Sequence, residues 1–276
     1  MPAASLAGLI DLALAEDVGS GDVTTEAIVP ADVSGTAEIV VREPGVVCGL
    51  EVALEVVRRL DPAASMEVLV PDGEAIHDPP EVAARLTGSL AALLTAERTL
   101  LNLVQRMSGI ATATRRYAEA IEGTGVALLD TRKTAPGMRA LDKYAVACGG
   151  GCNHRAGLFD AVLIKDNHVA AAGGIAAAIR AVRARHPQLP VEVEVDTLEQ
   201  LEQALGEEAD TILLDNMEIA TLREAVRRAA GRARLEASGG ITLQTLRDVA
   251  ETGVDAISAG ALTHSVRALD VALEVT

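Results

Sequence analysis

The chain has 276 residues, enough for one large barrel or two smaller domains, and 49% of them are hydrophobic. With no Trp, one Phe and two Tyr, the core must be built from Ala, Leu, Val and Ile. A formal net charge of −16 disfavours a nucleic-acid partner, because the phosphates would be repelled.

Cysteine usage and hydropathy predict a reduced protein of the cytoplasm. The three cysteines, Cys48, Cys148 and Cys152, cannot all pair in disulfides and lack the spacing of a four-ligand zinc site. The longest run without a charged side chain, residues 167–179, is too short to cross a membrane. The N-terminus lacks the basic start of a signal peptide, so we expect no membrane partner.

The first third of the chain predicts a small α/β domain. Residues 5–16 carry apolar side chains at helical spacing, and the turn-rich residues 16–25 predict a loop. Short apolar runs near Pro-Gly and Asp-Gly turns predict strands. The expected strands are residues 35–41, 45–50 and 65–70, and a helix is expected at residues 51–60.

A long helical pattern covers residues 89–121, and Ser108 with Gly109 predicts a break that leads into the second half of the chain. Arg98 and Arg106 fall on roughly one side of this helix. The pattern alone leaves open whether these two arginines are simply solvated surface residues.

After residue 125 the chain repeats one unit, a short apolar strand followed by a helix. The expected strands are residues 126–129, 161–164, 191–195, 211–214, 234–237 and 256–259. The expected helices are residues 138–147, 174–185, 198–205, 219–230 and 242–251. This alternation predicts a parallel sheet, and so many units favour its closure into a barrel.

Polar residues and glycines follow these strands, at the ends where the active sites of α/β barrels gather. The candidates there are Arg132, Lys133, Lys165, Glu194, Asp215, Ser238, Gly239, Gly240 and Gly260. We therefore expect charges, amides and glycines to converge on one rim of the barrel.

Residues 130–168 form a positive island in this acidic chain. They hold six Lys or Arg against four Asp or Glu, and they contain every lysine of the protein. The donors expected to face a ligand are Arg132, Lys133, His154, Arg155 and Lys165. A single arginine at a strand end is usually an ion pair, but five donors from three segments exceed the nearby acids. We predict a pocket that binds carboxylates and phosphates, with the third lysine, Lys143, in a structural role.

Three glycine-containing segments have different expected roles. Residues 238–240 and 258–260 come late in the barrel, where backbone N–H groups at a helix start bind phosphate; tight turns are the alternative. Residues 148–152 with His154 offer too few ligands for a metal and lack the thioredoxin spacing. Their glycines are expected to turn the backbone so that residues 153–155 point into the pocket.

Two acids end consecutive strands. Glu194 and Asp215 offer hard oxygen ligands for Mg²⁺ or acceptors for sugar hydroxyls. Glu192 and Asp196 share a strand face with Glu194, and a structural salt bridge for one of the three is an equal alternative.

Several segments together match one known family. They are Glu16-Asp17, Asp22-Val-Thr-Thr25, Thr95-Ala-Glu-Arg98, Asp130-Thr-Arg-Lys-Thr134, Pro136-Gly137, Gly149-Gly-Gly-Cys-Asn-His-Arg155, Ile164-Lys-Asp-Asn-His168, Glu192-Val-Glu-Val-Asp196 and Ser238-Gly-Gly240. With them the chain resembles the quinolinate phosphoribosyltransferases, also called carboxylating nicotinate-nucleotide pyrophosphorylases, nearly from end to end.

The resemblance implies an α/β fold with three parts. These are an N-terminal helix and α/β sandwich domain at residues 1–108, an open, seven-stranded parallel α/β barrel at residues 109–265, and a C-terminal segment at residues 266–276 that packs back on the N-terminal domain. The seventh strand would lie between Ala145 and His154. The resemblance also implies a homodimer, or a hexamer built from dimers, in which Arg98 of the partner subunit completes a shared active site.

The resemblance also implies an activity, the transfer of phosphoribosyl from phosphoribosyl pyrophosphate to quinolinate in de novo NAD biosynthesis, with Mg²⁺ as cofactor. Quinolinate would be held by Arg98 of the partner subunit, Arg132, His154, Arg155 and Lys165. The 5′-phosphate would be held by Ser238, Gly239, Gly240 and Gly260, and the pyrophosphate by Lys133 and Mg²⁺. The implied catalytic residues are Lys165, Glu194 and Asp215, and the last two would also hold the metal, directly or through water or substrate.

Two alternatives remain beside this activity. A lysine at a barrel strand end is also how Schiff-base aldolases are built, which leaves Lys165 open as an imine-forming residue. A relative of the same fold with an altered substrate is the second alternative.

Overall fold

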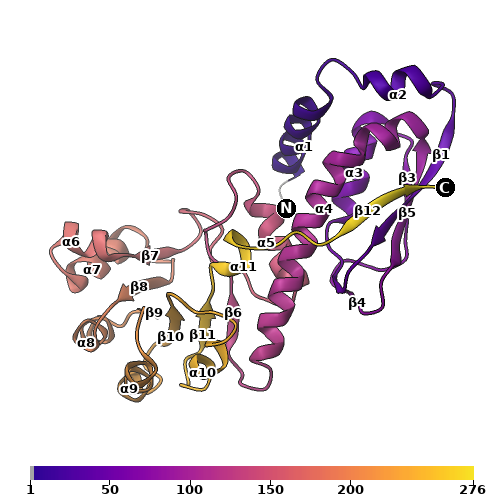
Figure 1. The fold of residues 1–276 in the computed structure, drawn as a ribbon. Coiled ribbons are helices and arrows are strands. Elements are labelled where there is room, and N and C mark those ends of the chain that lie inside the picture. Colours follow the sequence, from indigo (N-terminus) through magenta and orange to yellow (C-terminus); the bar gives the residue numbers. More distant parts are fainter. Residues whose placement is uncertain (1–2) are drawn as a thin grey trace. The chain divides into compact units, whose positions relative to one another are not determined.

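The computed structural model describes residues 3–276, which divide into two compact units (Figure 1). The first unit contains Met1–Arg115, Thr134–Gly150 and Ser265–Thr276, and the second contains Arg116–Lys133 and Gly151–His264. Residues 1 and 2, with which the expected first domain begins, lie outside the described residues.

One element belongs to a different unit than expected. Helix α5 (Arg139–Cys148) was expected in the barrel domain, but it belongs to the first unit. Asp142 on this helix is fully buried and accepts two hydrogen bonds from Arg106, at 2.9 Å from Nε and 2.8 Å from Nη2. Because Arg106 lies on α4 (Leu90–Ala120), the buried ion pair attaches α5 to the first unit.

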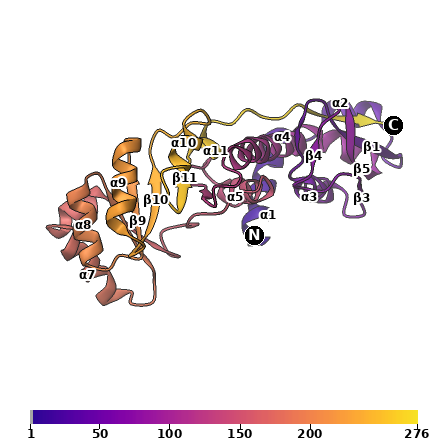
Figure 2. The ribbon, with the colours of Figure 1, turned by 90° about the horizontal axis from the view of Figure 1, so that it is seen from below.

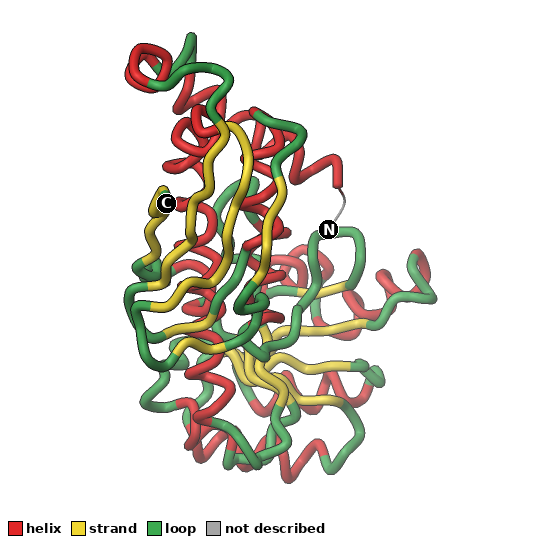
Figure 3. Tube along the Cα trace, turned by 90° about the vertical axis from the view of Figure 1, so that its right-hand side faces the viewer, coloured by secondary structure: helices red, strands yellow, loops and turns green. Residues whose placement is uncertain are grey.

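The first unit is built on an antiparallel sheet with the order β12-β1-β5-β3. Its strands are β1 (Ser34–Val41), β3 (Ser65–Val68), β5 (Glu81–Ser89) and β12 (Val271–Val275). A separate two-stranded sheet pairs β2 (Gly45–Val46) with β4 (Ala75–Ile76). The C-terminal strand β12 therefore completes the larger sheet beside β1, and Figure 3 shows the paired strands in yellow.

The remaining helices of the first unit are α1 (Ala3–Val18), α2 (Val23–Ile28) and α3 (Leu50–Leu60). Helix α2 replaces part of the loop expected at residues 16–25. The Asp22 carboxylate caps this helix by accepting hydrogen bonds from the backbone N–H of Thr24 (3.2 Å) and Thr25 (3.0 Å). The expected strand at residues 45–50 ends at Val46, because Gly49 turns the chain with φ 104° into α3.

The expected break at Ser108 and Gly109 is wrong, because α4 runs through both residues without interruption. A Cβ on Gly109 would lie 2.2 Å from the carbonyl oxygen of Arg267, so the glycine permits close packing of the C-terminal segment. Ser108 likewise has a packing role. Its hydroxyl accepts a hydrogen bond from the backbone N–H of Cys48 (2.9 Å) and donates one to the Cys48 carbonyl (3.1 Å).

The second unit contains a parallel sheet with the order β6-β11-β10-β9-β8-β7. Its strands are β6 (Ala127–Leu129), β7 (Val162–Ile164), β8 (Val191–Val195), β9 (Thr211–Asp215), β10 (Arg234–Ser238) and β11 (Ala256–Ser258). All six strands expected from the sequence are present. The seventh is reduced to a single parallel bridge between Leu129 and Cys152. The sheet is therefore an open barrel with β6 and β7 as its outermost regular strands.

Helices follow the strands of this unit. They are α6 (Asp166–Ala172), α7 (Ile175–Arg185), α8 (Leu198–Gly206), α9 (Ile219–Ala229), α10 (Leu246–Ala250) and α11 (Ala261–His264). Figure 2 shows α7, α8 and α9 along one side of the strands. Helices α6 and α11 were not expected, and α10 is shorter than the expected helix at residues 242–251. None of the helices in residues 3–276 is both long and apolar enough to span a membrane.

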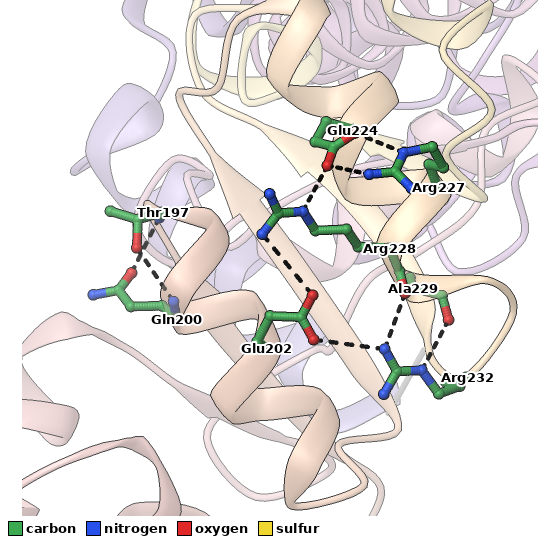
Figure 4. A network of polar contacts seen from close by, with 8 residues as sticks. All are labelled: Thr197, Gln200, Glu202, Glu224, Arg227, Arg228, Ala229 and Arg232. Carbon is green, nitrogen blue, oxygen red and sulfur yellow. Dashed lines mark hydrogen bonds and ion pairs between the residues drawn. The ribbon is translucent and has the colours of Figure 1, made fainter.

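Neighbouring helices of the barrel are joined by exposed ion pairs (Figure 4). Glu202 on α8 contacts Arg228 of α9 at 4.0 Å and Arg232, just beyond α9, at 3.6 Å. Glu224 pairs with Arg227 and Arg228 on its own helix. Exposed ion pairs contribute about 0–1 kcal/mol each, so these contacts orient the side chains between α8 and α9 but add little to the stability of the fold.

Candidate active site

A cavity of about 390 Å³ lies at the C-terminal ends of the parallel strands in the second unit. The predicted residues that line it are Arg132, Lys133, His154, Arg155, Lys165, Glu194, Asp215, Ser238, Gly239 and Gly240. The topology explains the convergence. All but His154 and Arg155 lie at, or shortly after, strands whose C-terminal ends share one edge, and these two follow the single bridge at Cys152.

Two predicted residues do not line this cavity. Arg98 lies on α4 in the first unit and lines a different hollow together with Asp22 and Thr95. Gly260 is not among the lining residues, and a Cβ there would come within 3.1 Å of Lys133 Cδ and 2.9 Å of the His264 ring. The glycine thus makes room for the Lys133 side chain.

Two arginines form one wall of the cavity. Burial, and next the nearby Arg132 guanidinium, lower the pKa of Arg155 from its ordinary value. The Nε of Arg132 is buried and has no hydrogen-bond partner among the described residues. Because a buried unpaired donor is costly, this pair of guanidinium groups is suited to an anion that would satisfy both.

His154 is held by two buried acids. Its Nε2 lies 3.1 Å from Glu192 Oε2 and 3.5 Å from Glu236 Oε2, and these hydrogen bonds raise the pKa of His154 to about 10. Its Nδ1 accepts the backbone N–H of Arg155 at 2.7 Å, which opposes a second ring proton. Nε2 therefore keeps its proton in either charge state of the ring.

The two acids themselves are poorly solvated. Burial, the largest influence, raises the pKa of Glu192, and the neighbouring Glu236 raises it further, while the hydrogen bond from His154 lowers it. One oxygen of each carboxyl group, Oε1, is buried without a hydrogen-bond partner among residues 3–276. His154, Glu192 and Glu236 also lie close enough to hold one metal ion. The three residues form a compact polar cluster, of which His154 and Glu236 line the cavity.

Lys165 and Glu194 form an ion pair at the mouth of the cavity. The lysine side chain is 46% exposed and the glutamate 13%, so the ammonium group remains accessible to a ligand. Lys165 directly precedes α6, and its backbone N–H donates to His168 Nδ1 at 2.9 Å. This bond explains why a histidine follows three residues later, a role that the sequence pattern did not reveal.

A turn held by hydrogen bonds also lines the cavity, through Asp215, Asn216 and Gly239. Asn216 adopts φ 52°, donates from its side chain to Asp215 Oδ2 (2.7 Å), and donates its backbone N–H to Ser238 O (2.9 Å). Gly239 adopts φ 94°, and a Cβ there would lie 2.2 Å from Asn216 Oδ1. Only glycine fits this close approach.

The expected helix start behind this turn is wrong. The helix was expected from residue 242, but α10 begins at Leu246. The intervening residues form a turn in which Thr242 N–H donates to Thr245 Oγ1 at 3.1 Å. An anion at residues 238–240 would therefore meet loop backbone groups and not a helix N-terminus.

Sequence reasoning missed Glu236. It lies in the middle of strand β10, and it lines the cavity while contacting His154. Strand alternation carried the signal, because Glu236 and Ser238 are two residues apart and so face the same side. Glu192 was placed on the correct face with Glu194, but its contact with His154 was not foreseen.

The fold and the cavity together define a class of protein. A parallel α/β barrel that gathers arginines, lysines, acids and a glycine turn at the C-terminal ends of its strands is typical of an enzyme that acts on small anionic substrates.

Comparison with known proteins identifies the family. Residues 22–108 match "Quinolinate phosphoribosyl transferase, N-terminal domain", and residues 110–274 match the C-terminal domain of the same family. The nicotinate-nucleotide pyrophosphorylase [carboxylating] of Mycobacterium leprae is 52% identical over 271 residues, which cover 95% of this chain and 94% of that protein. The chain belongs to the quinolinate phosphoribosyltransferase family, which confirms the resemblance found in the sequence.

Further relatives agree in sequence and in structure. Quinolinate phosphoribosyltransferase [decarboxylating] 1b of Nicotiana tabacum is 42% identical over 294 residues, covering 99% of this chain and 83% of that protein. The structure of the nicotinate-nucleotide pyrophosphorylase from Francisella tularensis superposes with a TM-score of 0.95 at 41% identity, covering 100% of this chain and 98% of that one.

Proposed function

We propose that the protein transfers the phosphoribosyl group of phosphoribosyl pyrophosphate to the ring nitrogen of quinolinate, with loss of CO₂. The products are nicotinate mononucleotide and pyrophosphate. The observation that carries the proposal is the family membership, at 52% identity to a relative named for this reaction. The cationic cavity supports it independently, because both substrates are small polyanions.

Quinolinate is a flat pyridine with two adjacent carboxylates, and charge must orient it here. The cavity lining, within residues 3–276, includes no Phe, Tyr or Trp side chain that could stack on the ring. Arg132 and Arg155 would bind the carboxylates as forked donors, with Lys165 as a point charge. Arg98 of the partner subunit would close the site.

The phosphate groups would occupy the other side of the cavity. The backbone of residues 238–240 would hold the 5′-phosphate, and Lys133 would contact the pyrophosphate. Gly239 supports this role, because its φ of 94° turns the loop backbone in a way that a side chain would obstruct.

Glu194 and Asp215 are suited to hold Mg²⁺, since both are carboxylates that line the same cavity from neighbouring strands. When bound, the ion would neutralise charge on the departing pyrophosphate. In this proposal the same two carboxylates would also stabilise positive charge on the ribose ring.

The reaction requires positioning and charge more than a side-chain nucleophile. The ring nitrogen donates its lone pair to C1 of the ribose as the C1–O bond to pyrophosphate breaks. The positively charged ring then accepts the electron pair of the C–CO₂ bond, and a proton from solvent replaces the lost CO₂. Fixed cations around the carboxylates keep the ring aligned through both steps.

The two alternative activities are less favoured. A Schiff base needs a neutral amine, whereas Lys165 is paired with the Glu194 carboxylate. An altered substrate would not account for the names of the relatives, several of which specify the carboxylating or decarboxylating reaction.

The proposal extends to the setting of the enzyme. We place it in the cytoplasm as a homodimer, or a hexamer of dimers, without a nucleic-acid or membrane partner. The acidic net charge of −16 supports the expected lack of a nucleic-acid partner. The family resemblance of residues 95–98 supports the dimer, because Arg98 in this segment would serve the active site of the neighbouring subunit.

The test is the release of CO₂ from carboxyl-labelled quinolinate. We expect one CO₂ per nicotinate mononucleotide, and only when phosphoribosyl pyrophosphate and Mg²⁺ are both present. Lys165→Ala should abolish product, whereas Arg180→Gln, at an exposed position on α7, should keep full activity. Near-normal turnover by Lys165→Ala would contradict the role of this lysine. A borohydride-trapped adduct on Lys165 with a carbonyl substrate would favour the aldolase.

A further inference from the structure

Two thiols of the first unit lie together, outside the cavity described above. The sulfurs of Cys48 and Cys148 and a carboxylate oxygen of Asp72 are all within 4.8 Å of one another. Neither cysteine is in a disulfide, Cys48 is buried, and Cys148 is partly exposed. The two residues are 100 positions apart in sequence, so their meeting is a product of the fold.

The backbone on both sides of this pair is fixed. Cys48 exchanges two hydrogen bonds with the Ser108 hydroxyl, through its N–H (2.9 Å) and its carbonyl (3.1 Å). Cys148 is the last residue of α5, where Arg115 donates to the carbonyls of Gly149 (3.2 Å) and Cys148 (3.5 Å). The thiols are therefore held near each other by groups that do not involve sulfur.

The nearby carboxylate already has donors. Asp72 accepts hydrogen bonds from the backbone N–H groups of Gly49 (2.8 Å) and Leu50 (3.2 Å), and so caps the start of α3. It also accepts the Tyr144 hydroxyl at 3.0 Å. A metal ion bound here would compete with the three hydrogen bonds to Asp72. The other two ligands of this cluster would be the two thiolates. The environment therefore favours a reaction between the two sulfurs over metal binding.

We propose that Cys48 and Cys148 form a dithiol site, which a low-molecular-weight disulfide such as oxidised glutathione converts into an intramolecular disulfide. The new bond joins the end of α5 to the loop that starts α3. It leaves Cys152, which is exposed in the second unit, as a thiol.

The environment assigns different roles to the two sulfurs. The S–H of Cys48 donates toward Cys148, and this bond lowers the pKa of the Cys148 thiol despite the opposing effect of burial. The same bond, together with burial, raises the pKa of Cys48. Cys148 is also the more exposed of the two, so it is the attacking thiolate and Cys48 is the resolving thiol.

The exchange is balanced in two steps. The Cys148 thiolate attacks one sulfur of oxidised glutathione, and the S–S bond breaks to release one glutathione thiolate. Cys48 loses its proton to solvent and attacks the Cys148 sulfur of the mixed disulfide, which releases the second glutathione. Two protein thiols are oxidised, one glutathione disulfide is reduced to two thiols, and no further reactant is needed.

The disulfide has a physical consequence for the first unit. It closes a loop from residue 48 to residue 148, and cross-links across long loops restrict the unfolded chain most. Along the chain, α5 lies between Lys133 and His154, which both line the cavity. Oxidation would therefore link this helix covalently to the loop before α3.

The test treats the full-length protein with oxidised glutathione and maps its peptides without reduction. We expect one cross-linked peptide that contains Cys48 and Cys148, one remaining titratable thiol, and a mass lower by two hydrogen atoms. The thermal unfolding midpoint should rise, and dithiothreitol should reverse every change. Cys152→Ser is the matched control and should form the same cross-link.

Two variants separate the steps. Cys148→Ser, at the partly exposed position, should show no cross-link and no rise in the unfolding midpoint. Cys48→Ala should stop at a glutathione adduct on Cys148. The proposal is overturned by a cross-link between Cys148 and Cys152, by adducts without any cross-link in the wild type, or by a tightly bound metal ion that protects both thiols. The wild-type map alone decides, even if a variant does not fold.

Discussion

Gly239 shows how two local requirements can fall on one residue. Its φ of 94° favours glycine, and a Cβ added there would also collide with the side chain of Asn216. Gly231 has a similar φ of 76°, but nothing lies within 4 Å of a Cβ added there. The two glycines therefore separate the effect of backbone strain from the effect of a steric clash.

We expect Gly239→Ala to reduce kcat/KM for phosphoribosyl pyrophosphate at least tenfold, because the methyl group displaces Asn216 and with it the turn that lines the cavity. Gly231→Ala should lower the free energy of unfolding by about 1–2 kcal/mol, the usual cost of a left-handed residue, and leave activity unchanged. Steady-state kinetics and urea unfolding measure the two effects. Equal activity of both variants would contradict the clash.

His154 and its two acids offer a pH test at the same scale. Glu192 and Glu236 raise the pKa of His154 from 6.5 to about 10. A raised pKa stabilises the fold fully below the unfolded value near 6.5, and this contribution is lost as the pH rises towards 10. Glu236→Gln removes one of the two acids.

We expect the imidazole titration of His154 to move to a lower pH in Glu236→Gln, while Glu192 keeps it above 6.5. Nitrogen-15 NMR of the histidine side chains measures this midpoint directly. The variant should also lose less stability than the wild type between pH 7 and pH 9. An unchanged His154 midpoint would show that Glu236 does not contact the protonated ring.

At the scale of elements, a buried ion pair is one of the contacts that join α5 to the rest of the first unit. Asp142 is fully buried, and Arg106 is its bidentate partner from α4. The exposed pair of Arg180 and Glu207, at 3.3 Å, is the natural comparison, because its arginine side chain is 69% exposed.

Arg106→Met should lower the free energy of unfolding by about 2–4 kcal/mol, because it leaves the buried Asp142 carboxylate without its arginine partner. The loss should be smaller than for a fully buried pair, because Arg106 is partly exposed. Arg180→Gln should change it by less than about 1 kcal/mol. Urea unfolding followed by circular dichroism compares the variants. Similar small losses in both would mean that α5 is held by other contacts.

At the scale of the whole molecule, the placement of Arg98 in the first unit bears on assembly. The cavity lies in the second unit, and Arg98 is not among its lining residues. In our proposal, Arg98 serves the cavity of the partner subunit, so an inactive subunit can be rescued by a differently inactive one.

We expect Arg98→Ala and Lys165→Ala to be inactive alone and to regain activity after mixed refolding. Random pairing of equal amounts makes half of the dimers mixed, and each mixed dimer has one intact site, so roughly a quarter of wild-type activity should return. Activity per subunit after refolding measures the gain. No recovery, despite mixed dimers seen by mass spectrometry, would contradict a shared site.

Much of the fold could be predicted from local patterns. All six regular barrel strands were found, because short apolar runs that stop at charges or glycines are a local signal. The misses have local causes too. Gly109 suggests a helix break, but a glycine stands there because the Arg267 carbonyl approaches α4 closely. Helix α2 lies in a turn-rich stretch, and its start is stabilised by the Asp22 cap, which the local pattern did not indicate.

The sequence by itself determined which residue types stand at the strand ends, because strand period and side-chain chemistry are properties of neighbours in the chain. Only the tertiary structure decided that Glu236 meets His154, that β12 completes the sheet of β1, and that Cys48 lies beside Cys148. These contacts join residues far apart along the chain. No local pattern encodes them, since they follow from how the packed elements bring distant positions together.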